Sequence, residues 1–356
     1  MIYLDGFSGY GGFHLGLERA GFTFDKVYYS EINKYAIANY SYNFPNSIYA
    51  GSIDTICTNE EIKNIDFFTF GWPCQDNSIA GKRKGQTGGT RSGLLYEAVK
   101  ILNKFKPRNF IAENVLGLLS VNEGIDIVES IRVLAYLNES CPQYDIEMQL
   151  LNTRWVLPQN RERLYFVGHL RGSGSRQIFP IDENSSRTIK GTTDTAIVRC
   201  LTAGGHSGGM HSGMTLLRWQ KKDVGVVESE FSPALRASGG TDIRKKPMVR
   251  IGTYRTYKES NGLREMKDNI CPALSSRPRE DGSGQPIIQE GDIIRRLTPL
   301  EWERFQGLPD NWTEYGLFDG EIKSISDTRR YSLCGNGVSV PIVEMIGKKL
   351  YREPLI

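Results

Sequence analysis

Four side chains capable of covalent and acid–base chemistry stand beside apolar runs. Cys74 follows "DFFTFGWP", Glu113 lies near the end of "NFIAENV", and Arg161 and Arg163 belong to "QNRERLYFVG". A thiol at a strand end can be activated by a helix N-terminus or a cation. Two arginines two residues apart in a strand point to the same face. Together these groups form an electrophile-activating set, although each alone is also explained as a packed residue or a salt bridge.

A glycine-rich stretch, "DGFSGYGGF" (5–13), lies between a predicted strand and a predicted helix. Glycines there let the backbone approach a ligand closely, and a helix N-terminus offers free N–H groups. The stretch is not a G-x-G-x-x-G fingerprint, because His14 takes the last glycine position. Glu31 ends the second predicted strand, where an acid commonly binds ribose hydroxyls. These features indicate a nucleotide-like ligand; loop packing and helix capping by Glu31 are the alternatives.

Residues 1–170 alternate strand patterns with amphipathic helix patterns. We expect strands at 1–7, 26–32, 65–73, 109–115, 145–153 and 163–170, and helices at 13–22, 33–44, 93–105 and 124–139. This alternation predicts an α/β fold with a doubly wound, mostly parallel sheet, whose ligands lie beyond the carboxyl ends of the strands. Two more helices are expected, one at 297–309 with Thr298 as N-cap and one at 339–354.

The composition of the sequence changes at about residue 171, where Gly, Ser, Thr and Arg become frequent and helical periodicity ends. A chain of 356 residues suits two domains, one inserted in the other. We predict a first domain over 1–170, an irregular β-rich domain over 171–324, and a segment over 325–356 that returns to the first domain. Residues 171–290 carry 19 Lys and Arg against 13 Asp and Glu, as expected of a polyanion-binding segment or of a solvated face.

Several classes of protein are disfavoured by composition. No stretch approaches the ~20 apolar residues that span a bilayer, and the first residues have no signal-peptide pattern. The six cysteines are far apart and the four histidines are scattered, so we expect no metal site and a reducing, cytoplasmic location.

Over nearly its whole length the chain resembles the DNA cytosine-5 methyltransferases. The stretches that carry the resemblance, in the family's order, are "DGFSGYGGFHLGLERAGF", "GWPCQDNSIAGKRKG", "ENV", "QNRERLYFVG", "RRLTPLEWERFQGLPDNW" and "LCGNGVSVP". The chain departs from the family in three places. Ser52 replaces the Asp of a usual Gly-Asp-Ile, with Asp54 two residues on; Gly6 replaces a larger apolar residue, and Trp72 replaces Phe. Because of the first departure, a carboxylate contact to adenine would have to come from Asp54 instead of residue 52.

The resemblance implies methyl transfer from S-adenosylmethionine to C5 of a cytosine flipped out of a specific duplex DNA sequence. Cys74 would add to C6 and Glu113 would protonate N3. Arg163, with Arg161 beside it, would hold O2, and Asn114 would orient the backbone near the cytosine amino group. The implied catalytic residues are Cys74, Gln75, Glu113, Asn114, Arg161 and Arg163.

The resemblance also assigns binding residues. S-adenosylmethionine would contact Phe7, Gly9, Gly11, Gly12, Glu31, Ile32, Ser52, Ile53, Pro73, Asn336, Gly337 and Val338. The basic stretch 76–93 would close over DNA, and residues 171–290 would form the target-recognition region, because Arg reads guanine bidentately. The expected DNA contacts are Ser78, Lys82, Arg83, Lys84, Arg236, Arg244, Arg277 and Arg279.

A stand-alone, monomeric methylase of a restriction–modification or self-protection system in a prokaryote or virus is the expected role, with any cognate restriction endonuclease acting separately. The alternatives are a tRNA cytosine-5 methyltransferase, which usually has a smaller recognition region, and a catalytically silent DNA-binding homologue. A nicotinamide-dependent dehydrogenase is suggested only by the glycine-rich stretch.

Overall fold

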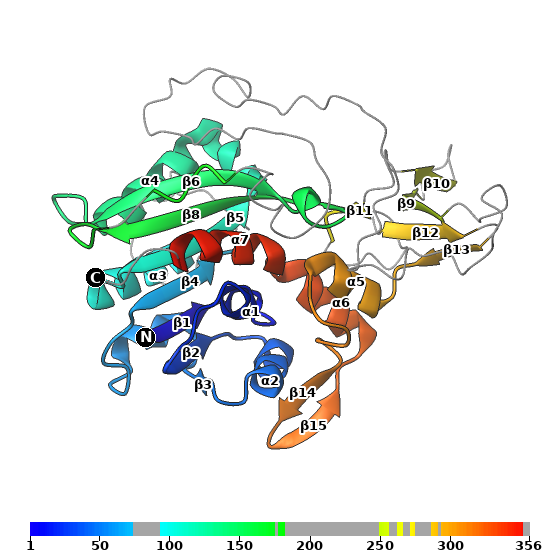
Figure 1. Ribbon diagram of the computed structural model, residues 1–356, viewed down its shortest axis with the longest axis horizontal. Helices are drawn as coiled ribbons and strands as arrows, with labels where there is room; N and C mark the ends of the chain where they lie inside the picture. Colours follow the sequence, from blue (N-terminus) through cyan, green and yellow to red (C-terminus); the bar gives the residue numbers. More distant parts are fainter. Residues whose placement is uncertain are drawn as a thin grey trace.

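The computed structural model describes residues 1–73, 93–174, 177–181, 249–255, 262–265, 271–274, 286–290 and 293–351. Its centre is a seven-stranded sheet of order β3-β2-β1-β4-β5-β8-β6 (Figure 1). The strands are β1 (Ile2–Gly6), β2 (Lys26–Ser30), β3 (Ile48–Tyr49), β4 (Phe67–Gly71), β5 (Asn109–Val115), β6 (Tyr144–Asn152) and β8 (Glu162–Leu170). Neighbours from β3 to β5 pair in parallel, and β8 pairs antiparallel with β5 and β6. The predicted doubly wound, mostly parallel sheet is confirmed.

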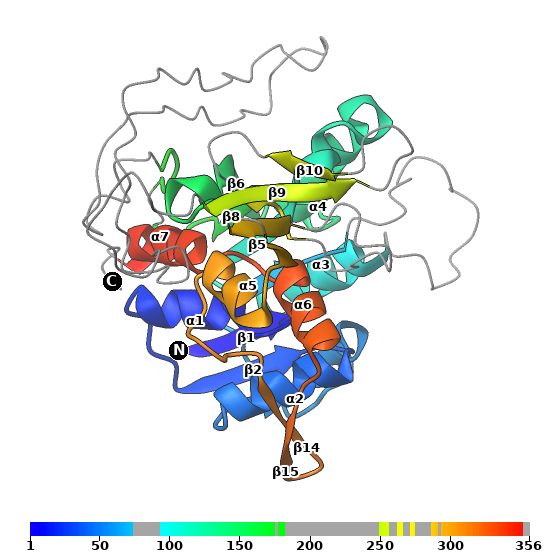
Figure 2. The ribbon, with the colours of Figure 1, turned by 90° about the vertical axis from the view of Figure 1, so that its right-hand side faces the viewer.

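Helices cover both faces of this sheet. Because successive side chains of a strand point to opposite faces, neighbouring strand residues pack against different helices. Phe67 packs in an apolar cluster with residues of α1 (Gly12–Arg19) and α7 (Val340–Tyr351). Phe68 packs in the cluster formed with α3 (Gly93–Phe105) and α4 (Ile125–Tyr136). Figure 2 shows α7 alongside α1, so the last helix of the chain covers the first.

A third apolar cluster joins α1 and α2 (Lys34–Asn43) to α5 (Pro299–Gln306) and α6 (Asp327–Asn336). Helix α5 begins as predicted: the Thr298 side chain accepts from the backbone N–H of Glu301, and the Glu301 side chain accepts from the backbone N–H of Thr298. This capping box satisfies two otherwise unpaired donors.

The part of the sequence between β8 and α5 forms a four-stranded antiparallel sheet of order β10-β9-β12-β13, on the right in Figure 1. Its strands are β9 (Val249–Arg255), β10 (Gly262–Glu265), β12 (Pro286–Glu290) and β13 (Ile293–Arg296), and two short strands, β7 (Gln159–Asn160) and β11 (Cys271–Pro272), pair in parallel beside it. The domain boundaries at 170 and 324 stay a prediction.

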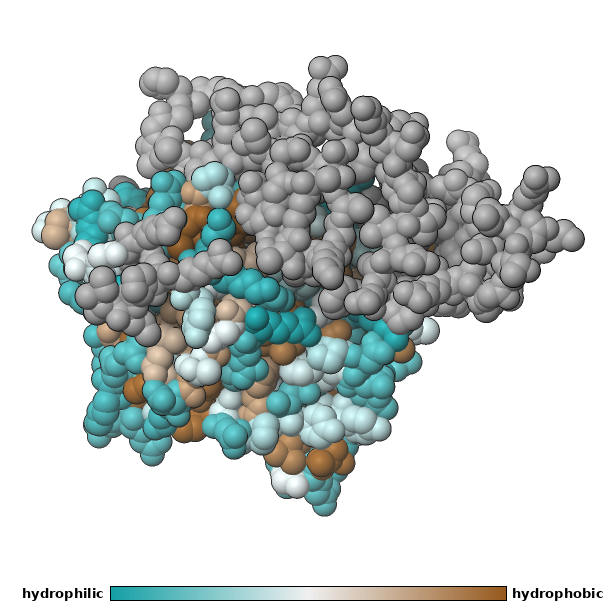
Figure 3. Space-filling model, viewed as in Figure 1, coloured by the Kyte–Doolittle hydropathy of each residue, from teal (hydrophilic) through white to brown (hydrophobic). Residues whose placement is uncertain are grey.

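A hairpin of β14 (Tyr315–Phe318) and β15 (Glu321–Ser324) was not expected from the sequence. It packs on α2 so closely that a Cβ at Gly316 would lie 2.9 Å from the Cβ of Ala38. Figure 3 shows apolar residues gathered on this hairpin, where Leu317 and Ile322 are exposed. In the described part of the chain, no helix is long and apolar enough to cross a membrane.

Candidate active site

Glu113 and Arg163 meet at the carboxyl end of β5, where β8 begins. Arg163 is registered opposite Val115, so it is a diagonal neighbour of Glu113 on the same face of the antiparallel pair. The Arg163 Nε lies 2.9 Å from the Glu113 Oε1, and the two side chains keep 16% and 12% of their surface exposed. An acid and a permanent cation are therefore paired at the rim of the sheet, where a ligand can still reach them.

The end of β4 lies directly beside this pair. Gly71 is registered opposite Glu113, and a Cβ at Gly71 would lie 3.3 Å from the Glu113 Oε2, so the glycine leaves room for the carboxylate. The Asn114 amide donates to the carbonyl oxygen of Trp72 at 3.1 Å. Asn114 thus ties β5 to the strand end that continues through Pro73 to Cys74.

Arg161 has different partners from Arg163. Its guanidinium is buried and donates to the carbonyl oxygens of Gly335 (3.3 Å) and Gly337 (2.6 Å). Burial, with the neighbouring charge of Arg163 adding to it, lowers the pKa of Arg161 to about 10. The structure therefore brings Arg163 to Glu113, whereas the hydrogen bonds of Arg161 go to the C-terminal segment of the chain.

The glycine-rich loop after β1 has the tight geometry expected of a ligand-binding turn. Gly9 and Gly11 have positive φ angles of 54° and 82°, a region that glycine adopts without strain. Phe7 also has a positive φ angle, of 54°, which is uncommon for a residue with a side chain. The Gly9 N–H donates to the Glu31 Oε2 at 3.0 Å, so the acid at the end of β2 is bonded to the loop. A Cβ at Gly9 would meet no described atom within 4 Å, which leaves open space above the loop.

The other predicted cofactor residues of the N-terminal half follow the strands β2, β3 and β4. The Glu31 Oε1 accepts the backbone N–H groups of Ile32 and Asn33, and the Ile32 side chain is exposed. Ser52 is the N-cap of a 3₁₀ helix, η1 (Ile53–Thr58), in which Ile53 is buried. Pro73 is half-buried after β4, whereas Asp54, the alternative to Ser52, is exposed.

The structure also brings Asn336, Gly337 and Val338 to the same loop from the far end of the sequence. Asn336 is the last residue of α6. A Cβ on Gly12 would lie 2.9 Å from the Val338 Cγ2, and a Cβ on Gly337 would overlap the Tyr10 ring. The two segments expected to bind one ligand are therefore in direct contact.

Ten predicted catalytic and DNA-contacting residues lie outside the described residues: Cys74, Gln75, Ser78, Lys82, Arg83, Lys84, Arg236, Arg244, Arg277 and Arg279. Their roles stay predictions.

Beneath the glycine-rich loop lies a buried polar cluster that the sequence did not indicate. Asp5 is fully buried, and its Oδ1 accepts from the Thr69 Oγ1 at 3.0 Å. The Tyr40 hydroxyl lies 3.4 Å from the Asp5 Oδ2 and 3.0 Å from the His14 Nδ1. Burial raises the pKa of Asp5 to about 8.

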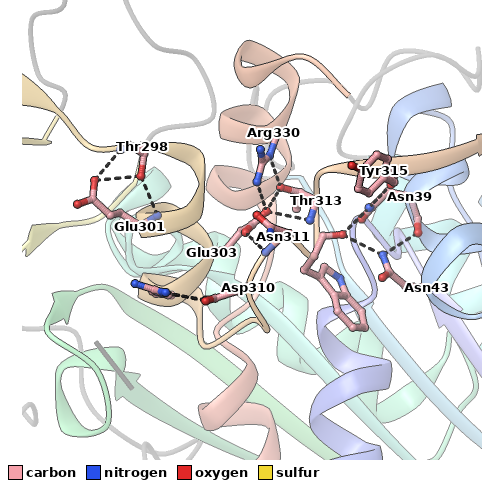
Figure 4. A network of polar contacts seen from close by, with 12 residues as sticks. Asn39, Asn43, Thr298, Glu301, Glu303, Asp310, Asn311, Thr313, Tyr315 and Arg330 are labelled. Carbon is pink, nitrogen blue, oxygen red and sulfur yellow. Dashed lines mark hydrogen bonds and ion pairs between the residues drawn. The ribbon is translucent and has the colours of Figure 1, made fainter. Parts of the chain in front are cut away.

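A second network holds the segment between α5 and β14 (Figure 4). The buried Glu303 carboxylate accepts from Arg330 at 2.9 Å and from the backbone N–H groups of Asn311 and Thr313. From the other side, Asn39 of α2 donates to backbone carbonyls of this segment. No sequence signal pointed to this network, because its members lie up to 276 residues apart.

Comparison with known proteins agrees with this geometry. The family described as C-5 cytosine-specific DNA methylase matches residues 1–352. The chain belongs to this family. It is a DNA cytosine-5 methyltransferase, as the order of its motifs indicated. Among curated relatives, the orphan methyltransferase M.SPRI of Bacillus phage SPR is 34% identical and covers 97% of this chain and 96% of its own. The type II methyltransferase M.Bsp6I of Bacillus sp. (strain RFL6) is 27% identical, over 98% of each chain.

Solved structures share the fold at lower identity. The Dnmt2 methyltransferase of S. pombe superimposes with a TM-score of 0.61 at 18% identity, covering 97% of this chain and 96% of that one. The EhMeth methyltransferase of Entamoeba histolytica gives 0.60 at 18% identity, covering 99% and 98%.

Proposed function

We propose that this chain is a restriction–modification-type methylase that transfers a methyl group from S-adenosylmethionine to a flipped cytosine through a Cys74 adduct. The observation that carries the proposal is the Glu113–Arg163 pair at the rim of the sheet, directly opposite the strand end that leads to Cys74. An acid, a fixed cation and a thiol at one sheet edge are what a nucleophilic attack on an electron-rich ring requires.

The residues around the glycine-rich loop fit S-adenosylmethionine. Gly9 leaves open space where a side chain would otherwise stand, and the Glu31 carboxylate lies at the end of β2, where ribose hydroxyls bind in such sheets. Phe7, Ile32, Ser52, Ile53 and Pro73 would border the ligand, with Gly11, Gly12 and the 336–338 segment completing the site. When bound, S-adenosylmethionine supplies an electrophilic methyl group.

At the base, the chain's own residues would divide the work. The Cys74 thiolate forms a bond to C6 of cytosine, and the Glu113 carboxyl gives its proton to N3, so the electron pair released by the addition makes C5 nucleophilic. Arg163 holds O2 and fixes Glu113 in place. After methylation, the C5 proton passes to solvent water, the C5–C6 double bond re-forms as Cys74 leaves as a thiolate, and N3 returns its proton to Glu113.

The DNA substrate follows from the family, and its recognition is proposed from charge and topology. Residues 171–290 are basic and include the strands β9, β10 and β12 of the antiparallel sheet. This region would read the target sequence, and the basic 76–93 stretch would contact phosphates. We propose that the protein acts as a monomer and that any cognate endonuclease is a separate protein.

The proposal is tested by trapping the adduct. Purified protein is incubated with S-adenosylmethionine and duplex DNA containing 5-fluorocytosine, which lacks the proton that C5 must lose. We expect a denaturant-resistant complex with the wild-type protein and none with Cys74→Ser, although that variant still binds DNA. Bisulfite sequencing of methylated plasmid DNA identifies the target cytosine. The same methylation assay with tRNA tests the alternative substrate. Methylation by Cys74→Ser at a rate near that of the wild type would contradict the covalent route.

A further inference from the structure

The last two residues of α6 and the two that follow, residues 335–338, are called here the α6–α7 junction. Hydrogen bonds hold this junction from two sides. On one side the Arg161 guanidinium donates to the carbonyl oxygens of Gly335 and Gly337. On the other side the Tyr10 hydroxyl donates to the carbonyl oxygen of Val338. Arg161 and Tyr10 are both buried, so each bond replaces one that water would otherwise make to the junction.

Tyr10 is itself fixed at both ends. Its ring lies against Gly337, where no larger residue fits. Its backbone carbonyl accepts a hydrogen bond of 3.0 Å from the Trp312 indole Nε1. Because the hydroxyl reaches the junction and the carbonyl reaches Trp312, the position of the glycine-rich loop depends on segments about 300 residues further along the chain.

The two anchors belong to the two halves of the site. Tyr10 stands between Gly9 and Gly11 in the glycine-rich loop, and Arg161 stands two residues before Arg163. The junction therefore bridges the segment that carries the base-binding arginine and the loop that faces the methyl donor. A shift of this junction would open the donor site while leaving the Glu113–Arg163 pair in place.

We propose that Tyr10 and Arg161 are positioning residues that hold the α6–α7 junction against the glycine-rich loop and thereby set the affinity for the methyl donor. The inference rests on the proposed function, because it takes the loop and residues 336–338 as the donor site. It reassigns Arg161 from contact with the base to support of the donor pocket.

The test is the substitution Tyr10→Phe, which removes one hydroxyl and keeps the ring that packs on Gly337. Without the Tyr10 hydroxyl, the carbonyl oxygen of Val338 is buried with no hydrogen bond from Tyr10, which weakens the hold on the junction. We therefore expect the Kd and KM for S-adenosylmethionine to rise roughly five- to tenfold. The KM for DNA and kcat should change less than about twofold. Calorimetric titration with S-adenosylmethionine and initial-rate kinetics with duplex DNA give these values.

Tyr144→Phe is the matched control. The Tyr144 hydroxyl also donates to a buried backbone carbonyl, that of Pro107 at 2.7 Å, but Tyr144 is registered opposite Leu170, at the far end of β8 from Arg163. This variant should lose stability to a similar degree without any change in the KM for S-adenosylmethionine.

Arg161→Lys provides a second arm, because lysine keeps the charge but cannot bond both carbonyls in the same geometry. It should raise the same KM. Equal KM values for S-adenosylmethionine in Tyr10→Phe and Tyr144→Phe, or an equal rise in the KM for DNA, would overturn the inference while the proposed function stands. A wild-type protein that neither binds S-adenosylmethionine nor methylates DNA would instead overturn the proposed function, and this inference with it.

Discussion

Asp5 is the residue whose environment differs most from that of an ordinary carboxylate. It is fully buried in β1, directly before the glycine-rich loop, and burial raises its pKa to about 8. In the unfolded chain an aspartate has a pKa of about 3.9. Between these two pH values, Asp5 therefore keeps its proton in the native state, whereas it has lost the proton in the unfolded state. Stability is highest below about pH 4 on this account and falls as the pH rises toward 8.

Asp5→Asn should remove this dependence, because the amide keeps the shape of the carboxyl group and does not titrate. We expect the variant to gain stability over the wild type between pH 5 and pH 8, by on the order of a few kcal/mol at the upper end. Urea unfolding monitored at several pH values measures the difference. Asp145→Asn, which removes an exposed carboxylate, is the control. A wild-type-to-variant difference that stays constant from pH 5 to pH 8 would rule out titration of Asp5.

The positions of individual candidate residues could be predicted where the signal was local. Glu113 and Arg163 were placed correctly at neighbouring strand ends because apolar runs mark strands and polar residues mark their ends. The partners of Arg161 and Tyr10 could not be predicted, since they lie 174 to 328 residues away. Such contacts depend on how α6 and α7 return to the sheet, which no local pattern encodes.

At the scale of elements, the helices α5 and α6 are joined by one buried ion pair. Glu303 is fully buried, and its carboxylate is shared between Arg330 and the backbone of the segment after α5. Buried charges of this kind add little net stability when paired, but removal of one partner leaves the other charge buried and uncompensated.

Glu303→Ala should therefore destabilise the protein by about 3–5 kcal/mol. The comparison variant is Asp310→Asn, which breaks the more exposed pair between Arg304 of the same helix and Asp310, beyond the end of that helix. This change should cost less than about 1 kcal/mol. Chemical denaturation of both variants provides the measurement. Equal losses of unfolding free energy in the two variants would show that the burial of Glu303 adds nothing to the cost of its removal.

The sequence predicted most of the regular elements of the α/β body, because their hydrophobic periodicity is strong. The N-cap at Thr298 is the clearest case, since a single short motif placed the start of α5. Helix α6 and the β14–β15 hairpin were missed. Helix α6 carries few apolar residues, and both strands of the hairpin have only four residues. Tertiary packing, of α6 on α5 and of the hairpin on α2, therefore fixes their structure rather than local pattern.

At the scale of the whole molecule, the fold is closed by its last helix. Gly16 of α1 approaches α7 so closely that an added Cβ would lie 2.6 Å from the Val343 Cβ. Val343, Ile346 and Leu350 of α7 are buried in the cluster that contains Phe13 and Leu17. Burial of each such side chain contributes about 1.5–3 kcal/mol, and three of them approach the total stability of a typical domain.

Deletion of residues 339–356 should therefore abolish cooperative unfolding, whereas deletion of residues 352–356 should not. Thermal unfolding followed by circular dichroism distinguishes the two truncated proteins, with the full chain as reference. A sharp transition near that of the full chain in the longer deletion would mean that α7 is dispensable.

The covering of α1 by α7 also has a consequence during synthesis. The first helix and the loop before it leave the ribosome early, yet the α7 residues that bury the helix follow more than 300 residues later. At about 5–20 residues per second, the amino-terminal apolar surface waits on the order of half a minute for its cover. A nascent chain of this kind is a natural client for chaperones, and the surface of α1 stays uncovered until Val343, Ile346 and Leu350 have been translated.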